Sequence, residues 1–207
     1  MNIIILGPQG SGKGTQAKLI SKKYNIQHIS TGDLLRDAVK NKTGIGLKVK
    51  DILDRGELVP DEIVISLIED KLKDSRGYIL DGFPRTIEQA KALDKITKID
   101  RVIDIIVSDK ESIKRISGRR SCPKCGSVFH ITNSPPKKEN ICDDCSIELI
   151  QREDDNEGVI KKRLRIYHEE TSLLEDFYRN EELLEEIDGE QPIEKVFEDT
   201  VKALETE

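Results

Sequence analysis

Four cysteines and one glycine-rich loop are the residues of this chain whose types and spacing point most directly to chemistry. The cysteines are Cys122, Cys125, Cys142 and Cys145, which gives the spacing C-x2-C-x16-C-x2-C. The loop reads GPQGSGKGTQ over residues 7–16, a G-x-x-x-x-G-K-G-T pattern. The first pattern indicates thiolate chemistry and the second indicates binding of phosphate groups.

The glycine-rich loop lies in the context that phosphate binding requires. It follows the continuous apolar run NIIIL at residues 2–6 and opens a helical pattern at Lys13. Glycines let successive backbone N–H groups point inward, and the helix N-terminus adds partial positive charge. Gly14 separates Lys13 from Thr15, where the usual pattern has Ser or Thr directly after Lys. Lys13 is still expected to reach the outer phosphates.

A second anion site is expected at DGFPR, residues 81–85, which ends the apolar pattern YILDG at residues 78–82. Open parallel sheets bind ligands at the carboxyl ends of their strands. Arg85 can clamp a phosphate there through two N–H groups, and Asp81 can hold a water on Mg²⁺. Further single arginines near element boundaries fit either phosphate contacts or surface ion pairs: Arg36, Arg115, Arg119, Arg120, Arg152 and Arg163. A GTPase is disfavoured because the chain has no N-K-x-D box.

The cysteine spacing lies in the range of a four-thiolate zinc site. Gly126 follows Cys125, where a turn can aim backbone N–H groups at sulfur. Four thiolates leave no open coordination position, so the predicted role is structural. Zinc would replace a hydrophobic core in a segment of about 35 residues. Three alternatives are two disulfides, a thioredoxin-like redox motif, and a site in which His130 replaces one cysteine. His28 and His168 are interpreted as structural or surface residues.

Composition limits the remaining possibilities. The chain has 207 residues, a formal net charge of −6, 36% charged and 36% hydrophobic residues. This mild acidity argues against a general nucleic-acid binder. No apolar stretch is long enough to span a membrane, and the start, MNIIILG, lacks the basic region of a signal peptide. A cytoplasmic location is therefore predicted, where disulfides are disfavoured.

Strands that alternate with helices must position these residues. Apolar runs predict strands at residues 2–6, 27–30, 78–82, 101–107 and 185–189. Helical patterns occupy residues 13–23, 31–40 with Thr31 and Asp33 as cap candidates, 60–72, 85–93, 109–120, 156–186 and 192–204. Between residues 119 and 153 the pattern breaks, with VFHIT as a possible hairpin strand. The alternation predicts an α/β fold with a mainly parallel sheet wrapped by helices.

Several motifs in fixed order resemble one family. They are GPQGSGKGTQ, HISTGDLLR, GELVPDEI, DGFPRT, GRR before an inserted segment, and REDD followed by KKRL. Together they resemble adenylate kinase, in the long-lid form found in bacteria, over nearly the whole chain. The resemblance implies a P-loop core of residues 1–29, 60–118 and 156–207, an AMP-binding insertion of residues 30–59, and a zinc-containing lid of residues 119–155. The family is mostly monomeric.

The resemblance also implies roles for individual residues. Catalytic roles would fall to Lys13, Arg85, Arg119, Arg152 and Arg163. The ATP site would comprise Gly10, Ser11, Gly12, Lys13, Gly14, Thr15, Arg115, Arg119, Val128, Phe129 and Gln191. The AMP site would comprise Thr31, Arg36, Glu57, Leu58, Val59, Gly82, Phe83, Pro84, Arg85, Gln89, Arg152 and Arg163. Gln9 stands where the family usually has Pro, at a position that turns the loop without donating to phosphate, so this change puts little in doubt. Gln191 stands where the family usually has Lys, and this change should matter little if the contact is through the backbone.

The expected reaction is ATP + AMP ⇌ 2 ADP, with Mg²⁺ carried by ATP and ATP, AMP and ADP as the partners. It requires in-line alignment and positive charge on the transferred group, needs no general base, and needs a closing lid to exclude water. A kinase acting on UMP, CMP or GMP is the second hypothesis, although Thr31 and Val59 resemble the AMP-specific form. A zinc-ribbon nucleic-acid binder is the third. It is disfavoured because Lys124, Lys137 and Lys138 are interleaved with acidic residues.

Overall fold

The computed structural model describes residues 1–73 and 75–206, so residues 74 and 207 of the expected core ranges lie outside the described residues. The strands are β1 (Asn2–Leu6), β2 (Gln27–Ser30), β3 (Tyr78–Asp81), β4 (Arg101–Ile106), β5 (Arg119–Ser121), β6 (Val128–His130) and β7 (Leu184–Asp188). The helices are α1 (Lys13–Tyr24), α2 (Thr31–Lys40), α3 (Gly44–Asp54), α4 (Asp61–Leu72), α5 (Ile87–Ile96), α6 (Asp109–Ser117), α7 (Glu157–Ile166), the π-helix η1 (Tyr167–Thr171), α8 (Leu173–Asn180) and α9 (Ile193–Glu205).

Five strands form a parallel sheet in the order β2-β3-β1-β4-β7. Ile5 of β1 pairs with Asp81 of β3, and Leu6 pairs with Asp104 of β4. The strands therefore end at a common edge, and the glycine-rich loop leaves the central strand there. This arrangement confirms the predicted α/β fold with a parallel sheet wrapped by helices.

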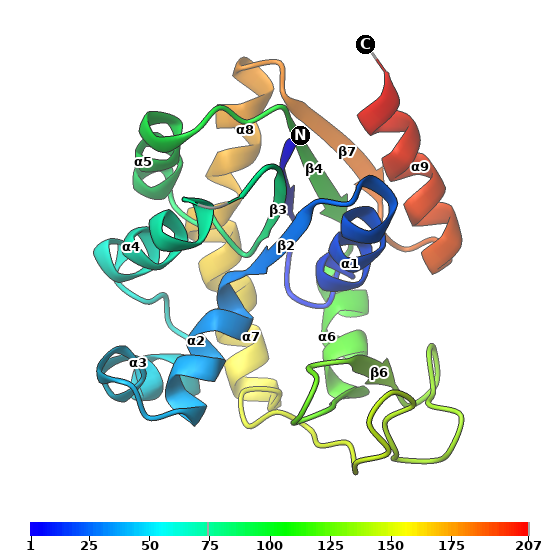
Figure 1. The fold of residues 1–207 in the computed structure, drawn as a ribbon. Coiled ribbons are helices and arrows are strands. Elements are labelled where there is room, and N and C mark those ends of the chain that lie inside the picture. Colours follow the sequence, from blue (N-terminus) through cyan, green and yellow to red (C-terminus); the bar gives the residue numbers. More distant parts are fainter. Residues whose placement is uncertain (74, 207) are drawn as a thin grey trace.

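Both faces of the sheet are covered by helices (Figure 1). Successive side chains of a strand point to opposite faces, and β1 shows this plainly. Ile4 and Leu6 pack in a core with residues of α4, α5 and α8. Ile3 and Ile5 pack in a second core with residues of α1 and α9. Because both faces are buried, the strands read as continuous apolar runs and not as alternating ones.

Two segments extend from the end of the sheet where the strands finish. Helices α2 and α3 form one of them, and residues 119–155, here called the cysteine segment, form the other (Figure 1). In the cysteine segment β5 and β6 pair antiparallel, and Ser121 also bridges to Ile150. The segment leaves the core after α6 and returns at α7, and these two helices pack together through Ile116 and Ile160. Among the described residues, no helix has the length and apolar character that crossing a membrane requires.

The structure corrects three predicted boundaries. The cap of α2 is Ser30, whose hydroxyl accepts from the backbone N–H of Asp33, and not Thr31 or Asp33. Helix α6 ends at Ser117, because the chain enters β5 at Arg119. The helix expected over residues 156–186 is two α-helices joined by the π-helix η1. It ends at Asn180, after which Glu182 takes a left-handed conformation (φ 57°) and the chain turns into β7.

Candidate active site

A cavity of about 1050 Å³ lies at the carboxyl edge of the sheet, between the glycine-rich loop, α2, α7 and the cysteine segment. Every residue for which the resemblance implied nucleotide contact lines this cavity, with one difference. Phe83 is fully buried and packs in the core beneath the sheet edge instead. Residues that lie far apart in the sequence thus meet at one place.

The glycine-rich loop folds as its glycines require. Gly7, Gly10 and Gly12 have φ values of 128°, 83° and 101°, which side chains rarely adopt. Lys13 follows as the first residue of α1, and its ammonium group donates to the carbonyl oxygen of Pro8 at 2.7 Å. Burial lowers the pKa of Lys13 to about 8, and the positive charge of Arg85 adds to the lowering.

Asp81 ends β3 directly beside this lysine. Its Oδ2 lies 3.4 Å from Nε2 of His28, which ends up next to it because β2 and β3 are neighbours. Burial alone would raise the pKa of Asp81, but the contact with His28 and the charge of Lys13 hold it below its usual value. A carboxylate at this position can hold a hydrated divalent cation beside the phosphate loop.

Four arginines concentrate positive charge in the cavity. Burial together with the nearby Arg163 lowers the pKa of Arg85 to about 10. Burial together with Arg119 lowers the pKa of Arg152 to about 10 in the same way. Such pKa values leave both groups charged at neutral pH. The positive charges of these arginines repel one another, and a ligand with several negative charges reduces this repulsion. The cavity is therefore suited to several phosphate groups.

Two acidic residues hold this cluster in position. Arg163 donates to Asp154 at 2.7 Å. Arg119 contacts both carboxylate oxygens of Asp155, a residue that is 3% exposed. Both aspartates belong to the REDD motif at residues 152–155, but nothing local in the sequence shows which arginine each contacts.

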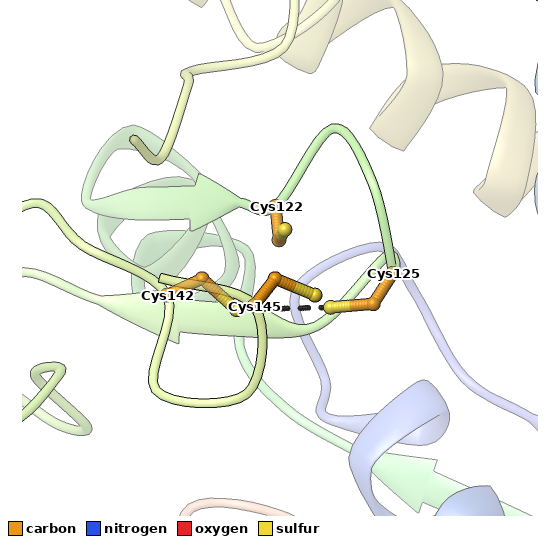
Figure 2. Close-up of side chains that lie close together, drawn as sticks. All are labelled: Cys122, Cys125, Cys142 and Cys145. Carbon is orange, nitrogen blue, oxygen red and sulfur yellow. Dashed lines mark hydrogen bonds between the residues drawn. The ribbon is translucent and has the colours of Figure 1, made fainter. Parts of the chain in front are cut away.

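The four cysteines meet within the cysteine segment (Figure 2). Their Sγ atoms all lie within 4.8 Å of one another, and Figure 2 shows the side chains converging from two turns. In the first turn Gly126, at φ 71°, donates its N–H to the oxygen of Cys122. In the second, Ser146 at φ 55° donates to the oxygen of Cys142. All four thiols are free of disulfides, so the cluster is poised to hold a metal ion.

His130 has a different role from the one considered for it. Its Nδ1 accepts from the backbone N–H groups of Thr132 and Asn133, at 3.1 and 3.0 Å. The described residues that form the metal-binding group are the four cysteines alone. Four thiolates satisfy a tetrahedral ion such as zinc.

Comparison with known proteins decides the family. A family model described as adenylate kinase matches residues 5–183. An adenylate kinase from Archaeoglobus fulgidus is 48% identical over 99% of this chain and 98% of its own length. Adenylate kinases from Caldicellulosiruptor bescii and Lachnospira eligens are each 50% identical over 99% of this chain, covering 99% and 100% of their own.

The chain belongs to the adenylate kinase family. It is therefore a nucleoside monophosphate kinase, a phosphotransferase with the four-cysteine lid expected from the sequence. The cavity has one part next to the glycine-rich loop and a second part between α2 and α7. Arg115 lies in the first part, where it donates to Glu111 at 2.8 Å and to the oxygen of Ser11 at 3.4 Å.

The π-helix η1 also contributes to the cavity, and the sequence did not predict it. Tyr167 and Thr171 of η1 line the cavity. The hydroxyl of Thr171 donates to the backbone oxygen of Arg85 at 3.0 Å. Single π-turns inside helices are frequent at functional sites. No local sequence signal distinguishes such a turn from an ordinary helix.

Proposed function

We propose that this protein catalyses the reversible transfer of a phosphoryl group from MgATP to AMP, which yields two molecules of ADP. One observation carries the proposal: Lys13 and the arginines 85, 119, 152 and 163 line the same cavity, between the glycine-rich loop and the segment of α2. Charge is thus concentrated where a group would pass between two bound nucleotides. The names of the relatives, all adenylate kinases, support the same reaction.

The proposed division of labour follows the three parts of the chain. Residues 1–29, 60–118 and 156–207 form the core that binds the ATP phosphates. Residues 30–59 form the AMP-binding insertion. Residues 119–155 form a lid. The residue assignments are those implied by the resemblance, with Phe83 supporting the AMP site from the core.

The chemistry asks the protein for alignment and charge. When AMP is the acceptor, the nucleophile is an ionised oxygen of its phosphate, so no general base is needed. Lys13 would bind the outer phosphates of ATP, and Arg85 would hold the phosphate of AMP. Arg119, Arg152 and Arg163 would neutralise charge on the transferred group. Mg²⁺ supplies further charge neutralisation when it arrives with ATP, and Asp81 fits a role in holding its water.

The lid would exclude water during transfer, since water would otherwise accept the phosphoryl group. The structure offers contacts suited to a closed lid. Lys40 of α2 donates to the oxygen of Pro123 at 2.9 Å, and Lys18 of α1 donates to the oxygen of Gly126 at 3.5 Å. Both acceptors lie on the first cysteine turn. Zinc at the four cysteines would keep this turn in shape and take no part in the chemistry. We propose that the enzyme is a monomer. We also propose that it acts in the cytoplasm, where the cysteine thiols stay reduced.

The test is a coupled assay that offers AMP, CMP, UMP or GMP with MgATP under equal conditions. Phosphorylation of AMP well above the others is expected, together with little ATP hydrolysis when the acceptor is omitted. Equal rates with AMP and UMP would leave only the broader kinase class. Preferred use of UMP or CMP would favour the second hypothesis from the sequence.

A further inference from the structure

Gln89, on the first turn of α5, is 1% exposed and lines the cavity at its acceptor end. Its amide group makes two hydrogen bonds inside the protein. The oxygen Oε1 accepts from the backbone N–H of Arg85 at 2.8 Å. The nitrogen Nε2 donates to Oδ1 of Asp61 at 2.7 Å.

These two bonds determine the orientation of the amide independently of each other. A backbone N–H can only donate, so the atom that faces Arg85 must be the oxygen. A carboxylate can only accept, so the atom that faces Asp61 must be the nitrogen. A flipped amide would set two donors against each other at one end and two acceptors at the other, and each buried mismatch is costly.

Asp61 is placed for this role by its own surroundings. It is the first residue of α4, after Pro60, and its carboxylate reaches α5 from there. Its second oxygen accepts from the hydroxyl of Thr86 at 3.2 Å, and the same hydroxyl accepts from the backbone N–H of Gln89 at 3.2 Å. Asp61 does not line the cavity. It therefore acts on a bound ligand through Gln89.

The orientation decides what the cavity presents to a ligand. Gln89 has one N–H of Nε2 left after its bond to Asp61, because an amide nitrogen carries two hydrogens. A base beside this N–H must offer an acceptor. Adenine offers an unprotonated N1, whereas hypoxanthine and guanine carry hydrogen at N1 and would place a donor against a donor. A site built around one hydrogen bond rejects an analogue that cannot make it far more strongly than it rejects a change of size.

We propose that Asp61 is a specificity-determining positioning residue: by fixing the Gln89 amide, it makes the acceptor site select a base with an acceptor at ring position 1. This inference rests on the proposed function, because it concerns the base of the monophosphate in the AMP site. It adds a residue outside the cavity to the determinants of that site.

The experiment compares three acceptors that differ at the base: AMP, purine riboside 5′-monophosphate and IMP. Purine riboside keeps the N1 acceptor and lacks the amino group, and IMP carries hydrogen at N1. The unmodified protein is expected to use AMP at least 50-fold more efficiently than IMP in kcat/KM, with purine riboside monophosphate between them. Such a ratio corresponds to the loss of about one well-made buried hydrogen bond.

Asp61→Leu is expected to raise KM for AMP about tenfold and to reduce the AMP-to-IMP ratio at least fivefold, with KM for ATP within twofold of the unmodified value. Asp61→Asn is expected to restore most of both values. Its amide oxygen can accept from Gln89, and its nitrogen can donate to Thr86. Glu62→Leu is the matched control, since Glu62 lies exposed in the same first turn of α4 and forms no hydrogen bond with Gln89 or Thr86. Glu62→Leu is expected to change neither the KM for AMP nor the AMP-to-IMP ratio.

An unchanged AMP-to-IMP ratio in Asp61→Leu would overturn the inference. Equal increases in KM for AMP and for ATP would also overturn it, because they indicate a general structural effect. If Asp61→Leu does not fold, Asp61→Ser takes its place with the same expected ratio, because its hydroxyl is too short to reach Gln89. Failure of the unmodified protein to phosphorylate AMP would instead overturn the proposed function, and it is seen before any variant is made.

Discussion

Arg85 is a charged side chain that the protein holds in a partly buried position next to another positive charge. Burial and the charge of Arg163 lower its pKa, yet its Nε donates to the backbone oxygen of Gly82 at 2.8 Å and so points the guanidinium into the cavity. The backbone oxygen of Arg85 is itself held by Thr171. A charged group that is held by two neighbours costs little reorganisation when an anionic transition state forms.

Arg85→Ala is therefore expected to lower kcat by roughly 100- to 1000-fold, because the lost contact is strongest in the transition state. The dissociation constant for ATP should stay within about threefold, since Lys13 and the loop N–H groups hold the ATP phosphates. Steady-state kinetics and ATP titration of the variant measure the two quantities. A kcat within a few-fold of the unmodified value would remove Arg85 from the catalytic group.

Asp104 is a buried carboxyl that the proposed chemistry does not use. It is 2% exposed, and its Oδ1 has no hydrogen-bond partner in the described part of the chain. Burial, aided by the charge of Glu175, raises the pKa of Asp104 to about 7, and Glu186 acts in the same direction. Lys13 and Arg179 oppose the rise.

A raised carboxyl pKa means that the native state binds the proton more tightly than the unfolded chain does. The contribution of Asp104 to stability is thus fully present below about pH 4 and is lost as the pH rises to about 7. Asp104→Asn, which cannot ionise, is expected to raise the free energy of unfolding by roughly 2–4 kcal/mol at pH 8 and by little at pH 4. Urea unfolding at both pH values measures this difference.

Glu175→Gln serves as the comparison for this effect, because it removes a neighbouring charge and leaves Asp104 in place. It should stabilise the protein at pH 8 by less than Asp104→Asn does. An equal gain at both pH values from Asp104→Asn would contradict a titrating carboxyl and indicate a simple gain of a hydrogen bond.

At the scale of elements, the loop between α3 and α4 is joined to α7. Glu57 in this loop accepts from Lys162 of α7 at 2.7 Å and from Arg55 at 2.9 Å. Hydrogen bonds from Arg55 and then Lys162 lower the pKa of Glu57 to about 2. Gly56 has φ 67° and lies so close to Val159 that a Cβ there would clash. This loop, which is proposed to line the AMP site, therefore packs on the helix that carries Arg163.

Lys162→Met is expected to raise KM for AMP about two- to fivefold while KM for ATP stays unchanged, since one partly exposed ion pair is worth up to about 1 kcal/mol. Lys161→Met is the matched control. Lys161 is the neighbouring lysine, pairs with Glu157 within α7 and is exposed. Kinetics with each substrate varied separately give both constants. Equal effects of the two substitutions on KM for AMP would refute a specific link between this loop and α7.

The elements differ in how far sequence alone could predict them. The strands of the main sheet were predictable because burial on both faces leaves continuous apolar runs such as residues 2–6. The glycine-rich loop was predictable because its backbone needs glycine at fixed positions. The cap of α2 was predicted at Thr31 or Asp33 and lies at Ser30. All three are suitable cap residues, and only the backbone conformation decides among them.

Within the candidate site, sequence motifs indicated the cationic residues but not their partners. Arg163 with Asp154, and Gln89 with Asp61, are joined by contacts that depend on how helices and loops pack. The π-helix η1 depends on tertiary contacts in the same way. Single residues with a strong chemical character could therefore be nominated from sequence, whereas the residues that orient them could not.

At the scale of the whole molecule, the cysteine segment is the part least able to stabilise itself. Its buried apolar cluster consists of Cys122, Cys142 and Leu149, with Phe129 and Cys145 packed against it. Three of these five residues are the proposed zinc ligands. Without a metal, these three cysteines would no longer be held together, and thiolates near one another would repel. The segment would then keep too little apolar packing to stabilise its fold.

Removal of the metal is expected to lower the melting temperature by roughly 5–10 °C, since an ion that binds only the folded state stabilises it by mass action. Cys142→Ser should have a similar effect while turnover at low temperature stays measurable. Elemental analysis, a melting curve and a cold activity assay test this together.

Chelator treatment of Cys142→Ser is the control and should produce no further fall in melting temperature. Loss of all activity at every temperature on metal removal would point to a catalytic metal instead. A fully active and equally stable protein that contains no metal would show that the cysteines do not form a zinc site.

The bond between Lys13 and Pro8 bears on how quickly nucleotides can be exchanged. The oxygen of Pro8 also accepts from the backbone N–H of Ser11 at 3.2 Å. When a phosphate draws the ammonium of Lys13 away, that oxygen keeps a donor and is not left unpaired. Recapture of Lys13 by Pro8 can in turn accompany the departure of a phosphate. The lysine thus always has an acceptor within reach, so neither arrival nor release of a nucleotide has to pass through a bare buried charge, a condition that favours rapid turnover over tight retention.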